Sequence, residues 1–290
     1  MRNRFWLIGL LCLTALTTGC SSTPETGPAK PPDVLYMEGM TALQNNRFKP
    51  AADRFQEIEQ KHPFSPWATK AQLNLIYAHY KKGEYEDAVN ASLRFIRLHP
   101  RHRHASYAFY MRGMSHYQRI TDSYRDQSRT REAITAFREL ITRFPQSDYA
   151  WEAQRMLKLC TNRMAEQEMV VGRFYLDREE YIAAINRFSQ VVNNPEFQTT
   201  PFVEEALFSL VLASQRLGLM EESRNYAAVL GHNFPKGGFY QAATRLIQQK
   251  GDISRAQLAE LRRGVDEGSV LGRFFQGLAP TLLPTQTEVR

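Results

Sequence analysis

The sequence lacks the thiols that a disulfide framework would need. It has 3 cysteines in 290 residues, and only Cys160 lies beyond residue 20. A single remaining thiol cannot form an internal disulfide, which excludes a disulfide-stapled scaffold. We expect Cys160 to be a small apolar core residue on a helix rather than a reactive thiol.

Catalytic and nucleic-acid-binding motifs are also missing from the chain. No nucleophile motif and no phosphate-cradling glycine loop occurs, so nothing in the sequence favours an enzyme. The net charge is +7, and Arg2 and Arg4 supply two of these charges, which leaves 7 − 2 = +5 for the rest. There is no long Lys/Arg run, so we expect no nucleic acid. The mild basic excess permits acidic partners or a lipid surface.

Histidines cluster at only one place in the sequence. The segment His99-Pro100-Arg101-His102-Arg103-His104 offers three imidazoles within six residues. It surrounds a proline, has no carboxylate or thiolate, and is interleaved with cations that would oppose a metal ion. We interpret the segment as a solvated loop and expect no metal site.

The first twenty residues have the three parts of an export leader. Arg2 and Arg4 precede an apolar run from Phe5 to Leu16 that is too short to span a bilayer permanently, and Thr17-Thr18-Gly19-Cys20 follows. The pattern resembles the bacterial lipoprotein signal, although Thr17 stands where leucine is usual. This resemblance implies a signal peptide over residues 1–19 and a covalent lipid on Cys20, with no other cofactor expected. A plain secretory signal or an N-terminal anchor is the alternative.

The residues after Cys20 predict a flexible tether. Ser21 rather than Asp follows the cysteine, which by resemblance to lipoprotein sorting favours the periplasmic side of the outer membrane of a Gram-negative bacterium. Several acyl chains would hold the protein there, because each buried methylene contributes about 0.8 kcal/mol. Residues 20–32 are rich in Ser, Thr, Pro and Gly and lack apolar periodicity, as is typical of a linker.

Prolines recur along the rest of the chain and end segments with helical periodicity. They are Pro63, Pro100, Pro145, Pro195 and Pro235. A small residue precedes each by eleven or twelve positions: Ala51, Ala88, Ala133, Ala184 and Ser223. Proline ends a helix because it has no amide hydrogen and excludes the preceding residue from helical dihedrals. The period predicts an all-α repeat array.

Five helix pairs follow from this punctuation, and no stretch shows a strand pattern. The predicted helices are Asp33–Gln44, Phe48–His62, Pro66–Lys82, Tyr85–His99, His104–Arg119, Arg129–Phe144, Ser147–Asp177, Glu180–Val192, Pro201–Leu217 and Met220–Asn233, with a closing helix at Gly238–Lys250. The connection from Ile120 to Ser128 is longer than the others. Ser147–Asp177 has no punctuation and predicts one long spacer helix.

These elements divide the chain after the tether. Repeats one to three occupy residues 33–145, which we call the N-terminal half, and the spacer helix with repeats four and five occupies residues 146–250, the C-terminal half. Residues 251–290 are expected to hold a short helix at Ser254–Arg263 and a mostly disordered tail from Gly264.

The second pair carries the best copy of the repeat. The run from Ala78 through Gly83 and Tyr85 to Ala88, continued to Pro100, closely resembles the tetratricopeptide repeat. A small residue at the helix crossing recurs as Gly39, Gly113 and Gly172, whereas Ile76 and Val211 depart from it. The resemblance implies a solenoid in which the first helix of each pair lines a concave surface.

On this register, the concave surface of the N-terminal half is rich in tyrosine and methionine. The candidate substrate-peptide groove consists of Tyr36, Met40, Lys70, Tyr77, Tyr80, Lys81, Tyr110, Met114 and Tyr117. Tyrosine and methionine suit a surface that must accept varied apolar side chains. The alternative is that about half of these tyrosines pack between adjacent repeats.

Two further stretches indicate a more specific family. The segments Phe137–Ala150 and Val171–Phe188, with the long connection in repeat three and the spacer helix, resemble the BamD (ComL) family of outer-membrane-protein assembly lipoproteins over about residues 30–250. The resemblance implies a non-enzymatic subunit of the β-barrel assembly machine. Its N-terminal repeats would bind unfolded outer-membrane β-barrel substrates and another assembly lipoprotein.

The same resemblance implies that the C-terminal repeats dock on the barrel subunit, BamA. The basic positions Arg173, Arg187 and Arg216 are the candidate docking residues, and we expect them to be exposed. The competing hypothesis is a tetratricopeptide lipoprotein that scaffolds enzymes of peptidoglycan synthesis or hydrolysis.

Overall fold

The computed structural model describes residues 30–120 and 127–249, together with Ser254, Ala256, Gln257, Ala259, Glu260 and Arg262. The predictions for the leader, for Cys20 and for the tether up to residue 29 lie outside the described residues. So do residues 121–126 of the long connection and the tail from Gly264.

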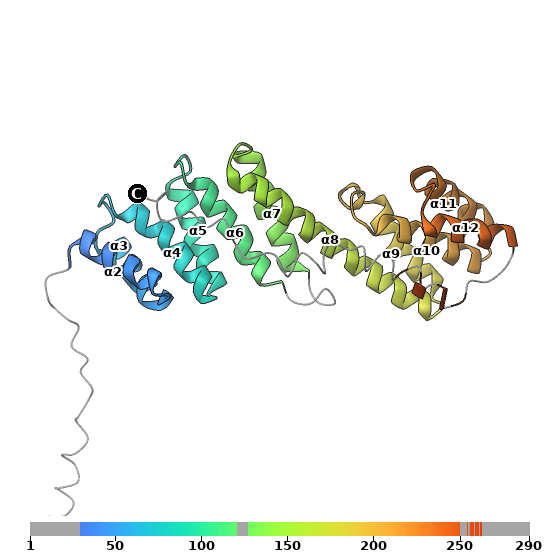
Figure 1. The fold of residues 1–290 in the computed structure, drawn as a ribbon, viewed down its shortest axis with the longest axis horizontal. Helices are drawn as coiled ribbons and strands as arrows, with labels where there is room; N and C mark the ends of the chain where they lie inside the picture. Colours follow the sequence, from blue (N-terminus) through green and yellow to red (C-terminus); the bar gives the residue numbers. More distant parts are fainter. Residues whose placement is uncertain are drawn as a thin grey trace, which may run out of the picture.

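The described residues form an elongated array of paired helices (Figure 1). The pairs are α2 (Pro32–Gln44) with α3 (Phe48–Lys61), α4 (Ala68–Lys82) with α5 (Tyr85–Leu98), α6 (Ala105–Gln118) with α7 (Ser128–Arg143), α8 (Asp148–Asp177) with α9 (Tyr181–Asn193), and α10 (Val203–Arg216) with α11 (Met220–Asn233). Helix α12 (Gly238–Gln249) closes the array, and no strand occurs in residues 30–120 or 127–249. The predicted all-α tetratricopeptide-repeat solenoid is confirmed.

Left-handed residues form the tight turns inside four of the pairs. Asn46 (φ 54°), Gly83 (φ 85°), Glu179 (φ 63°) and Gly218 (φ 79°) each follow the first helix of a pair. Glycine adopts this conformation without a steric penalty, whereas other residues lose roughly 1–2 kcal/mol. The prediction that Gly83 ends its helix in this way is confirmed. Glu179 was not expected to adopt the left-handed conformation.

Close helix crossings explain the small residues of the repeat. A Cβ atom added to a crossing glycine would lie 2.5–2.6 Å from a phenylalanine ring of the partner helix, in the pairs Gly39–Phe55, Gly113–Phe137 and Gly172–Phe188. In the two pairs that lack the glycine, the larger side chain lies on the first helix and the smaller one on the second. Ile76 and Val211 occupy the glycine position, while Ser92 and Ala227 occupy the phenylalanine position. The sum of the two side chains is therefore kept small enough for the helices to touch.

Helix α8 belongs to both halves of the molecule. Ser147 caps it by accepting a hydrogen bond from the Ala150 amide at 3.1 Å. Its first part contributes Met156 and Cys160 to the core beneath α7, and its later part contributes Met169 to the core beneath α9. In Figure 1, α8 runs obliquely between the two groups of helices. The spacer helix thus carries the packing from one core into the next.

The connections differ in detail from the sequence expectation. Helices α4 and α10 begin at Ala68 and Val203, so Pro66 and Pro201 lie in the preceding loops rather than in the helices. A 3-10 turn, η1 (Pro195–Phe197), was not expected. It places Phe197 in the core of the C-terminal half. Beyond α12, Ala256, Gln257, Ala259, Glu260 and Arg262 are helical, in agreement with the predicted short helix.

Candidate binding surfaces

Four of the predicted groove residues are buried and pack between repeats. These are Tyr36, Tyr80, Tyr110 and Met114. The Tyr36 ring lies 4.8 Å from Trp67, and the Tyr110 ring lies 5.3 Å from Tyr149. Side chains in such positions cannot contact a peptide. The expectation that the whole set lines an open groove is therefore corrected for these four residues, because each side chain is buried in the packing between helices.

Hydrogen bonds between consecutive repeats fix two of the buried tyrosines. Asn74 of α4 donates to the Tyr36 hydroxyl of α2 at 3.0 Å. Gln118 of α6 donates to the Tyr80 hydroxyl of α4 at 3.1 Å. Burial raises the pKa of Tyr110, helped by the nearby Glu152 carboxylate, and burial also raises the pKa of Tyr107 well above its ordinary value. The tyrosines therefore act as neutral spacers that set the distance between repeats.

The accessible part of the predicted groove centres on α4. Lys70 and Tyr77 are half-buried and Lys81 is exposed. Their spacing of seven and four residues puts them on one face of the helix. The Lys70 ammonium lies 5.2 Å from the Trp67 ring and the Lys81 ammonium 5.9 Å from the Phe48 ring. We call Lys70, Tyr77 and Lys81 the α4 strip. Of the other predicted groove residues, Met40 and Tyr117 are half-buried.

Arg173 lies inside an ionic cluster instead of on an open surface. Its Nε donates to Glu205 Oε1 at 2.7 Å, and Arg262 Nε donates to the same oxygen at 3.0 Å. The side chains of Arg173, Glu205 and Arg262 are 19 %, 1 % and 18 % exposed. The expectation of an exposed docking cation is therefore corrected at Arg173, because the buried Glu205 carboxylate requires a cationic partner.

Arg187 and Arg216 are exposed, as the sequence predicts. Arg187 pairs with Glu168 of α8 at 3.2 Å. The pair borders a groove of about 410 Å³ that is lined by Glu168, Tyr175, Ala183, Asn186, Arg187 and Gln190. Mixed charges and amide groups make this a polar surface. The docking role of the two arginines stays a prediction.

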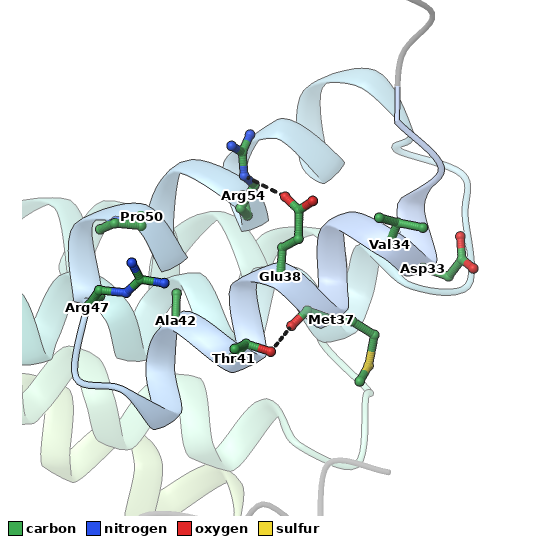
Figure 2. Close-up of a pocket in the computed structure, with 9 residues that line it drawn as sticks. All are labelled: Asp33, Val34, Met37, Glu38, Thr41, Ala42, Arg47, Pro50 and Arg54. Atoms are coloured by element: carbon green, nitrogen blue, oxygen red, sulfur yellow. Dashed lines mark hydrogen bonds and ion pairs between the residues drawn. The ribbon is translucent and has the colours of Figure 1, made fainter.

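A second groove, which the sequence reasoning missed, lies between α2 and α3 (Figure 2). It has a volume of about 640 Å³. Glu38 projects into it and accepts hydrogen bonds from Arg54 at 3.0 Å and from Lys30 at 2.7 Å. Val34 and Met37 are exposed along its rim. Apolar residues on an otherwise polar face of the first helix are the sequence feature that could have indicated this groove.

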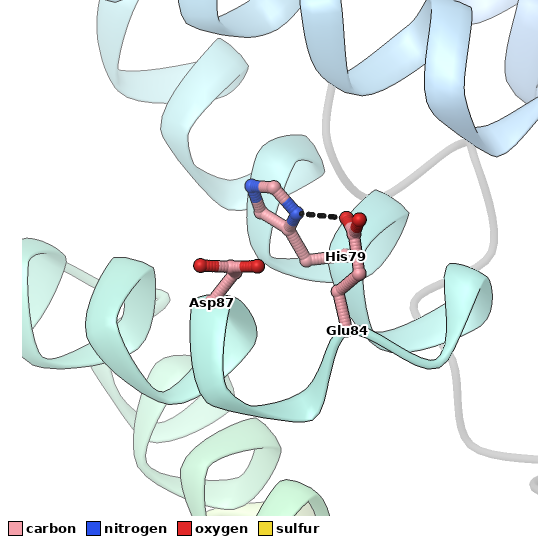
Figure 3. A group of neighbouring side chains, drawn as sticks. All are labelled: His79, Glu84 and Asp87. Carbon is pink, nitrogen blue, oxygen red and sulfur yellow. Dashed lines mark hydrogen bonds and ion pairs between the residues drawn. The ribbon is translucent and has the colours of Figure 1, made fainter.

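Among the described residues, one group of side chains of metal-ligand type comes close together, and it lies apart from the segment 99–104. The ligand atoms of His79, Glu84 and Asp87 lie within 4.8 Å of one another (Figure 3). His79 Nδ1 lies 3.0 Å from Glu84 Oε2, and Lys82 also pairs with Glu84. These two partners lower the pKa of the Glu84 carboxyl. An ammonium group on the same carboxylate opposes a cation, so the contacts fasten the turn between α4 and α5.

The histidines of the segment 99–104 form hydrogen bonds and aromatic contacts with neighbouring side chains and backbone. His99 Nε2 bonds to Gln72 Oε1 at 2.9 Å, and the His104 amide donates to His102 Nδ1 at 3.2 Å. The rings of His99 and His102 lie 5.0 Å and 5.6 Å from Phe95. Burial lowers the pKa of His102, helped by the neighbouring charges. The imidazoles thus shape the loop through these hydrogen bonds and ring contacts.

The remaining cysteine is a core residue, as the sequence predicts. Cys160 is completely buried in α8. Burial raises the pKa of its thiol to about 12, so the thiolate is not available at neutral pH. None of the helices within the described ranges has both the length and the apolar character required to cross a membrane.

Comparison with known proteins places these surfaces in a family context. Residues 28–230 match the YfiO family, described as outer membrane lipoprotein. The chain is 36 % identical over 281 residues to outer membrane protein assembly factor BamD of Caulobacter vibrioides, covering 96 % of this chain and 91 % of the relative. The chain belongs to this family. It is also 37 % identical over 243 residues to BamD of Rickettsia prowazekii, covering 83 % and 96 %.

Membership in the BamD family confirms the resemblance that Phe137–Ala150 and Val171–Phe188 carry in the sequence. The match over residues 28–230 includes the α4 strip, the whole of α8 and the exposed cations Arg187 and Arg216. All the surfaces described above, except for the contact of Arg262, therefore lie on the part of the chain that defines the family.

Proposed function

We propose that the chain is a non-catalytic, periplasm-facing scaffold of the outer-membrane β-barrel assembly machine, anchored by a lipid on Cys20. The observation that carries the proposal is the match to relatives named outer membrane protein assembly factor over nearly the whole chain. A solenoid supports this role because its extended surface can hold two partners at once. The helix α8 keeps those two partners at a fixed separation.

The N-terminal half receives the unfolded substrate on the α4 strip. A C-terminal strand that ends in an aromatic residue offers an apolar side chain and a terminal carboxylate. Tyr77 supplies an aromatic surface, and Lys70 and Lys81 on either side of it supply cations for the carboxylate. Both lysines already lie beside aromatic rings. The buried tyrosines contribute indirectly, because they hold α4 at a fixed place in the array.

The C-terminal half docks on the barrel subunit, BamA. Arg187 and Arg216 are exposed cations on α9 and α10. Arg173 takes part only by keeping α8 aligned with α10 through Glu205. Charge reversal at Arg187 and Arg216 should therefore release the subunit in a pull-down, whereas the repeats stay folded. Retention of the subunit by the double variant would contradict this placement.

Affinity purification from detergent-solubilised membranes tests the proposed function. We expect a β-barrel subunit to co-purify with the tagged chain. Recovery of a peptidoglycan synthase or hydrolase in its place would overturn the assembly role in favour of a cell-wall scaffold. The readout identifies the bound protein directly, so it does not depend on any assumed surface.

Crosslinking to a substrate C-terminal peptide tests the receiving surface. Tyr77→Ala with Lys81→Ala should reduce crosslinking strongly, because the pair removes the accessible ring and a cation. The matched control is Tyr226→Ala with Lys49→Ala, which removes a half-buried tyrosine and an exposed lysine elsewhere. Equal crosslinking by the α4-strip variant and the control would contradict the assignment of the α4 strip as the substrate-binding surface. Tyr80→Phe should leave crosslinking unchanged, because Tyr80 is buried.

A further inference from the structure

The loops that join one repeat to the next gather at one edge of the N-terminal half. We call this edge, formed by residues 62–67, 99–104 and 144–147, the proline edge. In Figure 1 the α3–α4, α5–α6 and α7–α8 connections lie along the upper side of the array. The three loops contain Pro63, Pro100 and Pro145 and no aspartate or glutamate. The charged side chains within these three loops are therefore the cations Arg101 and Arg103, and the exposed Asp148 follows the third loop at the start of α8.

Large apolar side chains point into solvent along the proline edge. Phe64 is 100 % exposed, and Leu98 at the end of α5 is 55 % exposed. Trp151, in the first turn of α8, is 63 % exposed, with the Arg155 guanidinium 5.4 Å from its ring. Phe64 thus leaves its whole side chain in solvent, next to Pro63 in the first of the three loops.

Exposed cations lie at the end of α5 and in the loop that follows it. Arg97, Arg101 and Arg103 are exposed, and none of them forms an ion pair with a carboxylate among the described residues. The helix macrodipole favours a cation such as Arg97 at the end of α5. It does not account for Arg101 and Arg103, which lie in the loop beyond the helix. Nor does it account for the exposure of Phe64.

The opposite edge, formed by the turns inside the pairs, carries charges of both signs in the N-terminal half. The turn of the second pair is followed by Glu84, Glu86 and Asp87. These carboxylates lie at the start of α5, where the macrodipole favours negative charge. The two edges therefore differ, because the proline loops contain no carboxylate, whereas the turn edge carries carboxylates together with cations such as Arg47 and Lys49.

The chain that leads from Cys20 enters the array at the proline edge. The Lys30 carbonyl accepts a hydrogen bond from His62 Nε2 at 2.9 Å, and His62 directly precedes Pro63 and Phe64. Ten residues separate Cys20 from Lys30 and can span at most about 35 Å. A lipid on Cys20 would therefore keep the membrane within reach of the proline edge.

We propose that the proline edge of the N-terminal half rests on an anionic lipid surface. Arg97, Arg101 and Arg103 contact headgroup phosphates, while Phe64 and Trp151 enter the interfacial layer, the combination that holds peripheral proteins on membranes. The location of the membrane rests on the lipid anchor in the proposed function, whereas the contact itself needs only the side chains. The turn edge, which carries charges of both signs, then faces away from the bilayer.

Co-sedimentation with lipid vesicles tests the contact without the anchor. The chain from residue 20 onward, with Cys20→Ser, should bind vesicles that contain phosphatidylglycerol and phosphatidylethanolamine more tightly than phosphatidylcholine vesicles, and less tightly as salt rises. Arg101→Gln with Arg103→Gln should weaken binding by roughly fivefold per cation. Phe64→Ala should weaken it by about tenfold, because a buried phenylalanine loses its transfer free energy.

Matched variants at the other edge keep the test specific. Arg47→Gln with Lys49→Gln removes two exposed cations near the first turn, and Phe174→Ala removes an exposed phenylalanine near the fourth turn. Neither should change vesicle binding. Equal losses in both sets, or no preference for the anionic vesicles, would overturn the proposal.

Co-purification of the barrel subunit separates this inference from the proposed function. If Arg101→Gln with Arg103→Gln weakens vesicle binding and leaves co-purification intact, the lipid contact is supported. Loss of the barrel subunit with unchanged vesicle binding would show that the edge contacts protein and would overturn the lipid contact. If the parent chain binds vesicles through this edge but recovers no barrel subunit, the lipid contact stands and the assembly role fails.

Discussion

The N-terminal and C-terminal halves share one scaffold but fill their concave surfaces differently. In the N-terminal half, neutral rings stack between repeats, as Tyr36 does on Trp67, and amide side chains bond their hydroxyl groups. In the C-terminal half, two guanidinium groups converge on the buried Glu205 carboxylate. The glycine–phenylalanine crossing is the same in both halves, as Gly113–Phe137 and Gly172–Phe188 show.

This difference separates what makes the fold from what makes the surface. The helix crossings determine how the two helices of a pair pack together. They lie inside the protein and do not decide which other protein binds. The side chains that pack on the concave surface determine which groups stay accessible to a binding partner. Aromatic packing leaves Tyr77 half-buried between two lysines, whereas the ionic cluster uses the charge of Arg173 inside the protein. A buried ion pair adds little net stability over apolar packing, but removing one partner is costly.

Removal of the Glu205 carboxylate is the largest test of the contrast. Glu205→Ala should lower the free energy of unfolding of the C-terminal half by about 3–5 kcal/mol, because Arg173 and Arg262 lose their shared partner. Glu86→Ala, which breaks the exposed contact with Arg119, should cost at most about 1 kcal/mol. Urea unfolding with hydrogen exchange of the α10 amides measures both. Similar small losses would contradict a buried ionic core.

Alkaline pH should act on the aromatic half in particular. Burial raises the pKa of Tyr107 and Tyr110 above the ordinary value of about 10. Below about pH 10 both tyrosines are protonated in the folded and the unfolded chain, so the free energy of unfolding does not depend on them. Above that pH they ionise in the unfolded chain but stay protonated in the folded chain, so the free energy of unfolding falls as the pH rises. The loss is about 1.4 kcal/mol per pH unit for each tyrosine.

Tyrosinate absorbance and helical circular dichroism, recorded together, check the alkaline prediction. The part of the tyrosinate signal that Tyr107→Phe with Tyr110→Phe removes should rise only together with the loss of helical circular dichroism, since these two tyrosines ionise only on unfolding. Tyr107→Phe with Tyr110→Phe should make the fall in stability less steep. Ionisation of both tyrosines with the helices intact would refute the view that they are sealed spacers.

The shared crossing should respond equally in the two halves. Gly113→Ala and Gly172→Ala each place a methyl group against a phenylalanine ring, and each should cost about 1–3 kcal/mol through overpacking. Replacing Phe137 by Leu should restore part of the loss caused by Gly113→Ala. Thermal unfolding measures the series. A large cost in one half and none in the other would show that the crossing is not a common device.

The smallest effect is expected where the halves meet across α8. Arg138 of α7 pairs with Glu196 of η1 at 2.5 Å, and both side chains are partly exposed. Arg138→Gln should change stability by less than about 1 kcal/mol. It should nevertheless broaden the distribution of distances between spin labels placed on α5 and α11. An unchanged distribution would assign the relative position of the halves to α8 alone.

Most of the fold was predictable because its signals are local. Prolines end the second helices, Gly83 and Gly218 take the left-handed turns, and uninterrupted periodicity produces α8. The turn at Glu179 and the burial of Phe197 lacked such a signal. Both depend on contacts made only after the chain has folded.

The candidate surfaces were less predictable than the fold. Helical register places Tyr36, Tyr77 and Tyr80 on the first helices, but it cannot say which tyrosine the next repeat covers. Exposure depends on Trp67, Asn74 and Gln118, which come from other turns of the array. Arg173 was misjudged for the same reason, since Glu205 lies 32 residues away in the sequence.

One measurement tests the division between the halves most directly. Two variants, Tyr77→Ala with Lys81→Ala and Arg187→Glu with Arg216→Glu, are purified in parallel while the bound barrel subunit and the crosslinked substrate peptide are quantified. We predict that the first variant loses the substrate and keeps the barrel subunit, and that the second does the reverse. Loss of both ligands by either folded variant, or of neither by both, would contradict a scaffold with two separate binding halves.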